Sequence, residues 1–258
     1  MSEFALRAKE ITVRFGGLVA VDWVTFDVPA GGIVSLIGPN GAGKTTLFNA
    51  LTGLHPITTG RISLGEHNIT GLTPHRVAQL GVARTFQNIR LFGLMTAEEN
   101  VKVAMHSRLR SGAARTVLRT PRQRREERTA RANALELLEF FGLRAVAGEY
   151  ARNLSYGDQR RLEVARALAL APSVLLLDEP TAGMNPRESA EFTETVRRVR
   201  DEREVSVLII EHDMSVVMRI SERITVLDRG RVIAAGTPEE IRSHDSVVEA
   251  YLGKAARR

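Results

Sequence analysis

Apolar side chains recur along the chain with several spacings, and each spacing predicts a different kind of element. In residues 4–35 and 60–71, apolar and polar positions alternate, which is typical of short strands that bury one face. The run Ile33–Ile37 is apolar almost throughout and predicts a buried strand. Beyond it, helical spacing relates Leu47, Phe48, Leu51 and Leu54. The N-terminal part therefore predicts antiparallel strands interrupted by one buried strand and a helix.

The second half of the chain alternates strand-like and helix-like segments. The predicted strands are 174–177, 205–210 and 224–227, and the predicted helices are 187–201, 214–220 and 238–252. Strands that alternate with helices indicate a parallel sheet with helices on its faces. The fold class predicted from this pattern is α/β.

A segment between these two parts breaks the alternation and is mostly helical. A helix is expected to begin at 96–101, and residues 131–141 continue at helical spacing. We therefore expect an inserted helical subdomain within a single domain that spans 1–258. The predicted division is an α/β core of 4–94 and 165–240, a helical subdomain of 95–164 and a C-terminal helix of 241–258.

A glycine-rich segment stands between the predicted strand at 33–37 and the helix after it. It matches the pattern G-x-x-x-x-G-K-[ST] with the residues Gly38, Pro39, Asn40, Gly41, Ala42, Gly43, Lys44, Thr45 and Thr46. The backbone N–H groups of such a turn point at an anion, and the helix N-terminus adds its positive dipole end. Glycines let the backbone approach phosphates without an intervening Cβ. Lys44 would bind the β- and γ-phosphates and Thr45 would bind Mg²⁺, so the segment predicts nucleoside triphosphate binding.

Further polar residues stand where the predicted strands end. Asp178 and Glu179 follow the strand at 174–177, at the edge where an open α/β sheet binds its ligand. Asp178 suits the holding of Mg²⁺, and Glu179 is placed to accept a proton from an attacking water. His212 follows the strand at 205–210 on the same edge. Ser155 and Gly157 begin another helix, whose N-terminus is a second candidate anion site.

Composition and charge restrict the class of protein. The sequence has no cysteine, which excludes disulfides and thiolate metal sites. Its net charge is +6, and its most concentrated basic stretch is 108–131. Three interpretations of this stretch stay open: a solvated helix and loop, contact with anionic lipid headgroups, and contact with an acidic partner. Nucleic-acid binding is disfavoured because no aromatic residues are interleaved.

Neither a secretion signal nor a membrane-spanning segment is expected from the sequence. The N-terminal residues lack an apolar core of the secretory kind. No apolar run approaches the ~20 residues that a membrane helix needs. A role at a membrane would therefore be that of a peripheral subunit.

Together these segments resemble a known family in their order and spacing. Residues 38–46, 154–159, 174–179 and His212 are similar to the Walker A, signature, Walker B and switch-histidine elements of ATP-binding cassette (ABC) ATPases. The resemblance implies a P-loop NTPase cassette. Such a cassette has a RecA-like parallel-sheet core, an antiparallel β subdomain and an inserted helical subdomain.

The resemblance also implies roles for individual residues. Phe15 would stack on adenine, where tyrosine is usual, and Gln87 would meet Mg²⁺ and the attacking water. Glu179 would be the general base, and His212 would contact the γ-phosphate. The Mg²⁺ ligands would be Thr45, Gln87 and Asp178. Asn185 stands in the D-loop, where aspartate is more usual, and the segment that contacts the permease would contain Arg90, Leu91 and Phe92.

Two such cassettes pair head to tail, so the resemblance implies that each ATP lies between one chain's Walker A and its mate's signature. The signature residues here are Ser155, Tyr156, Gly157, Asp158 and Gln159. Tyr156 and Asp158 depart from the common Leu-Ser-Gly-Gly-Gln, whereas Ser155 and Gly157 are retained. The implied cofactors are ATP and Mg²⁺.

The signature wording is similar to the Liv-type branch, whose members serve bacterial branched-chain amino acid importers. The basic stretch, Ala182-Gly183-Met184-Asn185-Pro186 and the ending Glu249-Ala250-Tyr251-Leu252-Gly253 point the same way. The implied partners are a second, paralogous cassette, two integral membrane permeases and, indirectly, a periplasmic or extracellular substrate-binding protein. The implied location of this chain is the cytoplasmic face of the bacterial inner membrane, as a peripheral subunit. No nucleic-acid partner is expected.

Related cargoes stay open as alternatives, namely urea, other amino acids or exported lipopolysaccharide. A non-transport ABC ATPase is a further alternative. The single Walker A and the lack of a long heptad run disfavour it.

Overall fold

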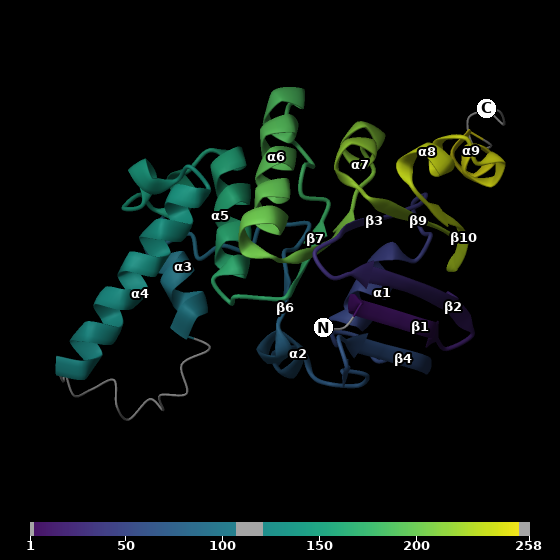
Figure 1. Ribbon diagram of the computed structural model, residues 1–258, viewed down its shortest axis with the longest axis horizontal. Helices are drawn as coiled ribbons and strands as arrows, with labels where there is room; N and C mark the ends of the chain where they lie inside the picture. Colours follow the sequence, from purple (N-terminus) through teal and green to yellow (C-terminus); the bar gives the residue numbers. More distant parts are fainter. Residues whose placement is uncertain (1–2, 107–120, 253–258) are drawn as a thin grey trace. The chain divides into compact units, whose positions relative to one another are not determined.

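The computed structural model describes residues 3–106 and 121–252 (Figure 1). Most of the basic stretch therefore lies outside the described residues. The chain forms two compact units, one of residues 1–87 and 173–258 and one of residues 88–172. The sequence had suggested boundaries after residues 94 and 164. The units divide instead after 87 and 172, so the helix that follows Ser155 belongs wholly to the second unit.

A six-stranded sheet forms the centre of the first unit, in the order β10-β9-β3-β8-β7-β6. Its strands are β3 (Ile33–Ile37), β6 (Val82–Arg84), β7 (Val174–Asp178), β8 (Ser206–Ile210), β9 (Arg223–Asp228) and β10 (Arg231–Gly236). The strands from β6 to β9 are parallel, whereas β10 pairs antiparallel with β9. β3, β7 and β8 are buried at every residue, as expected for strands covered on both faces. The hydrophobic pattern predicted neither β6 nor β10.

A second, antiparallel sheet has the strand order β2-β1-β4-β5. Its strands are β1 (Phe4–Phe15), β2 (Leu18–Pro29), β4 (Thr59–Leu64) and β5 (His67–Asn68). The prediction of short strands at 4–35 was wrong in length, because β1 and β2 each have 12 residues. Shifts of register interrupt the pairing of β1 with β2. Glu10 and Trp23 lie near these shifts and have positive φ of 55° and 53°. These bulges break the alternation and explain why the pattern indicated separate short strands.

Six helices of the first unit are described. They are α1 (Lys44–Leu51), α2 (Pro74–Leu80), α6 (Pro186–Arg203), α7 (Met214–Ile220), α8 (Pro238–Arg242) and α9 (Asp245–Leu252). Leu54 does not continue α1, which ends where Gly53 takes a φ of 71°. The predicted single helix at 238–252 is two helices separated at Ser243 and His244. Its extension beyond residue 252 lies outside the described residues.

Two apolar cores cover the two faces of the six-stranded sheet. Val34 and Leu36 of β3 face a core shared with α1 and the antiparallel sheet, and Ile37 faces a core shared with α7, α8 and α9. Figure 1 shows the same layering, with α6 and α7 on one side of the sheet and α1 on the other. The loops at the strand ends are therefore anchored on a rigid layer.

The described residues of the second unit are mostly helical. They form α3 (Ala97–His106), α4 (Pro121–Phe140) and α5 (Tyr156–Leu168), with short 3₁₀ turns at Arg144–Val146 and Ala151–Asn153. Its buried apolar residues come from all three helices and include Ala97, Val101, Ala134, Leu138, Leu162 and Ala165. In the described part of the chain, no helix combines the length and apolar character that a membrane span requires.

Candidate functional site

The glycine-rich loop joins β3 to α1 and takes conformations that only glycine adopts easily. Gly38 and Gly43 have φ of 153° and 99°. A Cβ at Gly38 would lie 2.1 Å from the carbonyl oxygen of Leu227, and one at Gly43 would lie 2.5 Å from that of Ala20. These glycines are therefore required by the close approach of the protein's own backbone, in addition to any phosphate. Gly41 has open space around it and a φ of 82°.

The side chain of Lys44 crosses the inside of this loop. Its ammonium donates hydrogen bonds to the carbonyl oxygens of Gly38 at 2.7 Å and Pro39 at 3.1 Å. Burial lowers the pKa of Lys44, and the nearby carboxylates of Glu179 and Asp178 oppose this shift. The ammonium is thus incompletely solvated, and an anion held by the loop would supply the missing negative charge.

Asp178, the last residue of β7, forms an ion pair that the sequence analysis missed. The Arg84 guanidinium, from β6, donates to Asp178 Oδ2 at 2.7 Å, and both side chains are only 7% exposed. Arg84 also donates to Asn49 Oδ1 in α1 at 2.7 Å. Arg84 therefore connects the helix of the glycine loop, the edge strand β6 and the predicted Mg²⁺ ligand.

Three residues predicted as catalytic meet at the carboxylate of Glu179. Glu179 Oε2 accepts a hydrogen bond from Gln87 Nε2 at 2.8 Å and lies 3.8 Å from His212 Nδ1. Gln87 follows β6, Glu179 follows β7 and His212 follows β8, so the parallel sheet brings their loops to one edge. The structure thus assembles residues that are up to 125 positions apart in the sequence (212 − 87 = 125).

The backbone of Glu179 is strained. Its φ is 48°, in the left-handed region that residues with a side chain rarely occupy. Its N–H donates to the carbonyl oxygen of Ile210 at 2.9 Å, which ties the loop after β7 to the end of β8. Such conformations persist where the surrounding structure holds them, and they concentrate at functional sites.

The residues at this edge fit a nucleotide-bound Mg²⁺ ion. Thr45, Asp178 and Gln87 offer hydroxyl, carboxylate and amide oxygens, the hard donors that Mg²⁺ prefers. Arg84 contacts Asp178 through Oδ2. Within 3–106 and 121–252, no group of three or more histidine, cysteine, aspartate or glutamate side chains could hold a metal by itself. A cation here would therefore depend on phosphate oxygens for much of its coordination.

Phe15 and Asn185 lie at two other predicted positions of the site. Phe15 ends β1, is 43% exposed and contacts the His55 ring edge to face, with 4.4 Å between centroids. Asn185 caps α6, because its Oδ1 accepts from the N–H of Glu188 at 3.0 Å and the Glu188 side chain accepts from the N–H of Asn185. Asparagine thus performs the capping that aspartate would perform at this position.

The predicted signature residues begin α5 in the second unit. The Ser155 hydroxyl caps the helix by accepting from the N–H of Asp158 at 3.2 Å, and it donates to Asp158 Oδ2 at 2.7 Å. Gln159 Nε2 donates to the carbonyl oxygen of Leu154 at 2.9 Å. Ser155 is exposed and Gly157 half-buried. The start of α5 is therefore partly open to solvent, and its binding of an anion stays a prediction.

Tyr156 has a structural partner that its place in the signature did not suggest. Its hydroxyl accepts hydrogen bonds from Arg160 at 2.9 and 3.2 Å, and Arg160 forms a buried ion pair with Glu163 at 3.3 Å. Glu163 Oε1 accepts from the N–H of Arg90 at 3.2 Å. A buried polar network thus runs from the signature to the predicted permease-contacting segment.

The predicted permease-contacting segment, Arg90, Leu91 and Phe92, has a fixed backbone. The buried Asn100 side chain accepts from the N–H of Phe92 at 2.9 Å and donates to its carbonyl oxygen at 3.1 Å. The Phe92 ring is exposed, with the Arg166 guanidinium 5.6 Å from its centroid. The segment therefore presents side chains on a held backbone.

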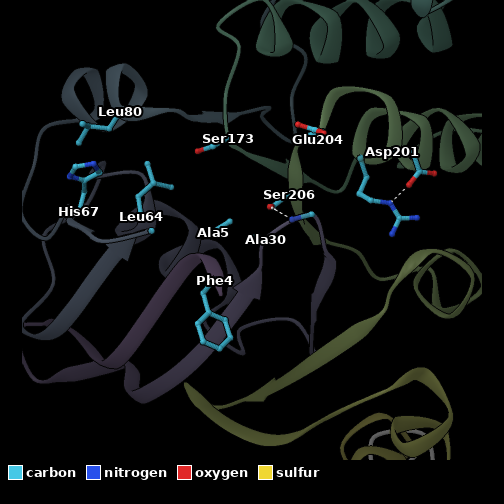
Figure 2. A pocket seen from close by; sticks show the side chains of 13 residues that line it. Phe4, Ala5, Ala30, Leu64, His67, Leu80, Ser173, Asp201, Glu204 and Ser206 are labelled. Carbon is cyan, nitrogen blue, oxygen red and sulfur yellow. Dashed lines mark hydrogen bonds and ion pairs between the residues drawn. The ribbon is translucent and has the colours of Figure 1, made fainter. Parts of the chain in front are cut away.

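A hollow of about 710 Å³ lies elsewhere in the first unit, and Figure 2 shows the side chains that line it. Its lining comes from β1, β4, β5, β8, α2, α6 and neighbouring loops, and includes Phe4, Leu64, His67, Leu80, Ser173, Asp201, Glu204 and Ser206. None of the residues predicted for nucleotide binding or catalysis lines it. The chemistry described above is therefore not located in this hollow.

Two family models match the sequence. One, described as ABC transporter, matches residues 21–182, and the other, described as branched-chain amino acid ATP-binding cassette transporter, matches residues 231–257. The chain is 48% identical over 255 residues to the high-affinity branched-chain amino acid transport ATP-binding protein LivG of Salmonella typhimurium. It shares the same identity with BraF, of the same description, from Pseudomonas aeruginosa; 99% of this chain and 100% of each relative are covered.

Solved structures of cassettes match the fold over almost the whole chain. An ATP-binding cassette of an ABC transporter, solved in its ADP conformation, has a TM-score of 0.84 and 28% identity and covers 97% of this chain and 99% of its own. A bacterial ABC transporter cassette solved as a dimer has a TM-score of 0.76 and 26% identity, with 90% and 98% covered.

Proposed function

The chain belongs to the ABC transporter family and is an ATPase of that type, and we propose that it powers the import of branched-chain amino acids through permease partners. The observation that carries this proposal is the 48% identity, over essentially the full length of both chains, to ATP-binding proteins of branched-chain amino acid transport. The match of residues 231–257 to the C-terminal model supports the same cargo.

We assign nucleotide binding to residues 38–46 and to Phe15. The loop N–H groups and the start of α1 bind the phosphates. The positive charge of the Lys44 ammonium, whose pKa burial lowers, attracts the same phosphates. Phe15, exposed at the end of β1, stacks on the adenine ring. Bound Mg²⁺, held by Thr45, Gln87 and Asp178, would neutralise charge that develops on the phosphates.

Hydrolysis is assigned to the residues that meet at Glu179. Glu179 accepts the proton of the attacking water, because its carboxylate stands at the ligand edge of the sheet. Gln87, whose amide already donates to Glu179 Oε2, orients that water. His212 contacts the γ-phosphate from the loop after β8. Phosphoryl transfer requires mainly positioning and charge compensation, and these side chains supply both.

This assignment predicts a separation of binding from turnover. Glu179→Gln keeps the shape of the side chain but removes the base, so it should bind ATP with parental affinity and hydrolyse it at least ~100-fold more slowly. A titration with a fluorescent ATP analogue and a phosphate-release assay measure the two quantities. Parental turnover in this variant would exclude Glu179 as the base.

The accessible start of α5 is assigned to the ATP of a second cassette. Ser155, Gly157 and their neighbours would contact the γ-phosphate held by the mate's Lys44 loop, and the dimeric cassette with a similar fold supports such pairing. We expect that mate to be a paralogous cassette. With such a mate, Lys44→Ala and Ser155→Ala in this chain each disable one of the two composite sites, so each single variant should keep part of the ATPase activity of the assembly and the double variant should lose it. Full activity of an isolated monomer would contradict this arrangement.

Arg90, Leu91 and Phe92 are assigned to the contact with the permease. Their backbone is held by Asn100 and Glu163, while the Phe92 ring is exposed. The protein would then act as a peripheral subunit at the cytoplasmic face of the inner membrane. An external substrate-binding protein would select the cargo.

Uptake of radiolabelled leucine tests the cargo. A host strain that lacks this gene should lose high-affinity leucine uptake, the parental gene should restore it, and the Glu179→Gln gene should not. Normal leucine uptake in the deletion strain would overturn the proposed cargo. The same strain assayed with urea and with other amino acids distinguishes the related cargoes.

A further inference from the structure

A buried carboxylate lies beneath the pair formed by Glu179 and His212. Glu211 is the residue after β8, and its side chain is 0% exposed. Among the described residues, no lysine or arginine forms an ion pair with it, and His212 Nδ1 lies 3.9 Å from its Oε2. A buried carboxylate without a cationic partner is costly unless hydrogen-bond donors satisfy it.

The donors that satisfy Glu211 come from two different loops. Oε1 accepts from the N–H of Thr181 at 3.0 Å and from its hydroxyl at 2.5 Å, in the loop after β7. Oε2 accepts from the N–H groups of His212 at 3.0 Å and Asp213 at 3.3 Å, in the loop after β8. In each of these four bonds a Glu211 oxygen is the acceptor. A carboxylate therefore fits the site, and a side chain that presents an N–H donor there does not.

Glu211 completes a second link between the two catalytic loops. The first link is the bond from the N–H of Glu179 to the carbonyl oxygen of Ile210. The second joins Thr181, two residues beyond Glu179, to the residue directly before His212. Both links lie within two residues of Glu179 or His212, whose side chains approach to 3.8 Å, and together they restrict how far these side chains can separate.

We propose that Glu211 is a positioning residue for ATP hydrolysis, because it fixes the loop of Glu179 against the loop of His212. The proposal rests on the roles proposed above for Glu179 and His212. It predicts that loss of the link lowers turnover and leaves the affinity for ATP unchanged. Among the described residues, no hydrogen bond or ion pair joins the phosphate-binding loop at 38–46 to the Glu211 side chain.

The test compares Glu211→Gln with the parental chain in the assembled transporter. An amide keeps the shape but places an NH₂ against donors of Thr181 or of His212 and Asp213. We expect kcat to fall about tenfold, the effect of one lost hydrogen bond to a charged group. The dissociation constant of a fluorescent ATP analogue should stay within about twofold of the parental value, because the substitution does not change the residues that bind ATP before the reaction.

Substitutions at Thr181 test the same link from its other end. Thr181→Val removes the hydroxyl at constant shape and should lower kcat, and Thr181→Ser, which keeps the hydroxyl, should lose less. The double variant Glu211→Gln/Thr181→Val should be no slower than Glu211→Gln, because both changes break one link. This series also decides the matter if Glu211→Gln fails to fold.

A matched control separates positioning from general destabilisation. Thr193 in α6 is buried, and its hydroxyl donates to the carbonyl oxygen of Ser189 at 2.7 Å, a bond within one helix that joins neither loop. Thr193→Val removes the same group and should lower the unfolding midpoint without changing kcat. Equal kcat losses in Thr193→Val and Thr181→Val would overturn the proposal, as would parental kcat in Glu211→Gln.

The outcome of the Glu179→Gln experiment separates failure of this proposal from failure of the proposed function. If Glu179→Gln abolishes turnover while Glu211→Gln does not change it, only the positioning role is wrong. If Glu179→Gln hydrolyses ATP at the parental rate, the catalytic assignment itself is wrong.

Discussion

Replacing Arg84 by methionine isolates the buried ion pair that holds Asp178. The pair is short, at 2.7 Å, and both side chains are 7% exposed. Methionine preserves most of the aliphatic length of arginine but has no guanidinium, so the cation–π contacts to the rings of Phe48 and Phe86, at 5.4 and 5.2 Å, are lost together with the ion pair. The principal change is that the Asp178 carboxylate loses its cation while it stays buried.

The size of the effect follows from burial. Removing one partner of a buried ion pair costs about 3–5 kcal/mol, because the remaining charge is uncompensated. Arg84→Met also removes the hydrogen bond to Asn49. The exposed pair Arg231–Asp22 has the same 2.7 Å distance, but the Arg231 side chain is 72% exposed. Breaking an exposed pair costs no more than about 1 kcal/mol.

Urea unfolding followed by circular dichroism measures both variants. We expect Arg84→Met to lose about 3 kcal/mol or more and Arg231→Met to lose less than about 1 kcal/mol. The double variant Arg84→Met/Asp178→Leu should recover part of the loss, because no buried charge is then left unpaired. Equal losses for Arg84→Met and Arg231→Met would refute the argument from burial, and no recovery in the double variant would refute the argument from uncompensated charge.

Three further predictions concern single residues. Burial holds the pKa of Lys44 below its ordinary 10.5, so its charge destabilises the free fold below that lowered pKa. Lys44→Met should therefore raise the unfolding midpoint of the nucleotide-free chain at pH 7 and weaken ATP binding at least ~tenfold in a titration; a lower midpoint would contradict this. The hydrogen bond from the Ser215 hydroxyl is the largest of the effects that lower the pKa of Asp213, which caps α7. Asp213→Ala should cost about 1 kcal/mol at pH 7, and the difference from the parental chain should disappear as pH falls through that lowered pKa, below 3.8; a constant difference down to pH 2 would exclude the charged cap. Tyr156→Phe leaves Arg160 without its hydroxyl acceptor and should cost about 1–3 kcal/mol in thermal unfolding, whereas an unchanged midpoint would show that the network does not need it.

The sheet core could be predicted from the sequence because its strands are buried on both faces. The apolar run predicted β3 with its observed bounds, and the same signal placed β7 and β8 to within one residue at each end. Strand β10 was missed because it has no clear alternation. Gly230 is the one turn residue that the sequence shows before it, and in the structure Arg229 and Gly230 both take positive φ, 45° and 81°, as a type I′ hairpin requires.

The motifs of the site were found from the sequence, whereas the residues that support them were not. Gly38–Thr46 carries its chemistry within one short segment. Arg84 and Asp178 are 94 positions apart and meet only because β6 and β7 pair in parallel, with Arg84 opposite Leu176. Glu211 and Thr181 likewise belong to different loops. No local pattern encodes such pairs, so they became visible only with the sheet register.

The reason for the loop glycines also changed with the structure. The sequence explained Gly38 and Gly43 by the approach of phosphate. The structure adds the carbonyl oxygens of Leu227 and Ala20, which a Cβ would meet even without a nucleotide. Because those carbonyls belong to β9 and β2, the two glycines also let the cradle pack against both sheets. Substituting either glycine is therefore a change to the fold as well as to the binding site.

Buried polar groups explain how this edge of the sheet keeps its geometry. The side chains of Gln87 and His212 are exposed and follow the ends of parallel strands, so their own packing cannot fix them. The loops that carry them are held instead by buried hydrogen bonds. Arg84 donates to Asp178, and Glu211 accepts from Thr181 and His212, so each bond also fixes a direction. Apolar residues of equal volume would fill the same space without specifying direction. The desolvation of these groups is therefore a stability cost that the site carries in exchange for fixed catalytic geometry.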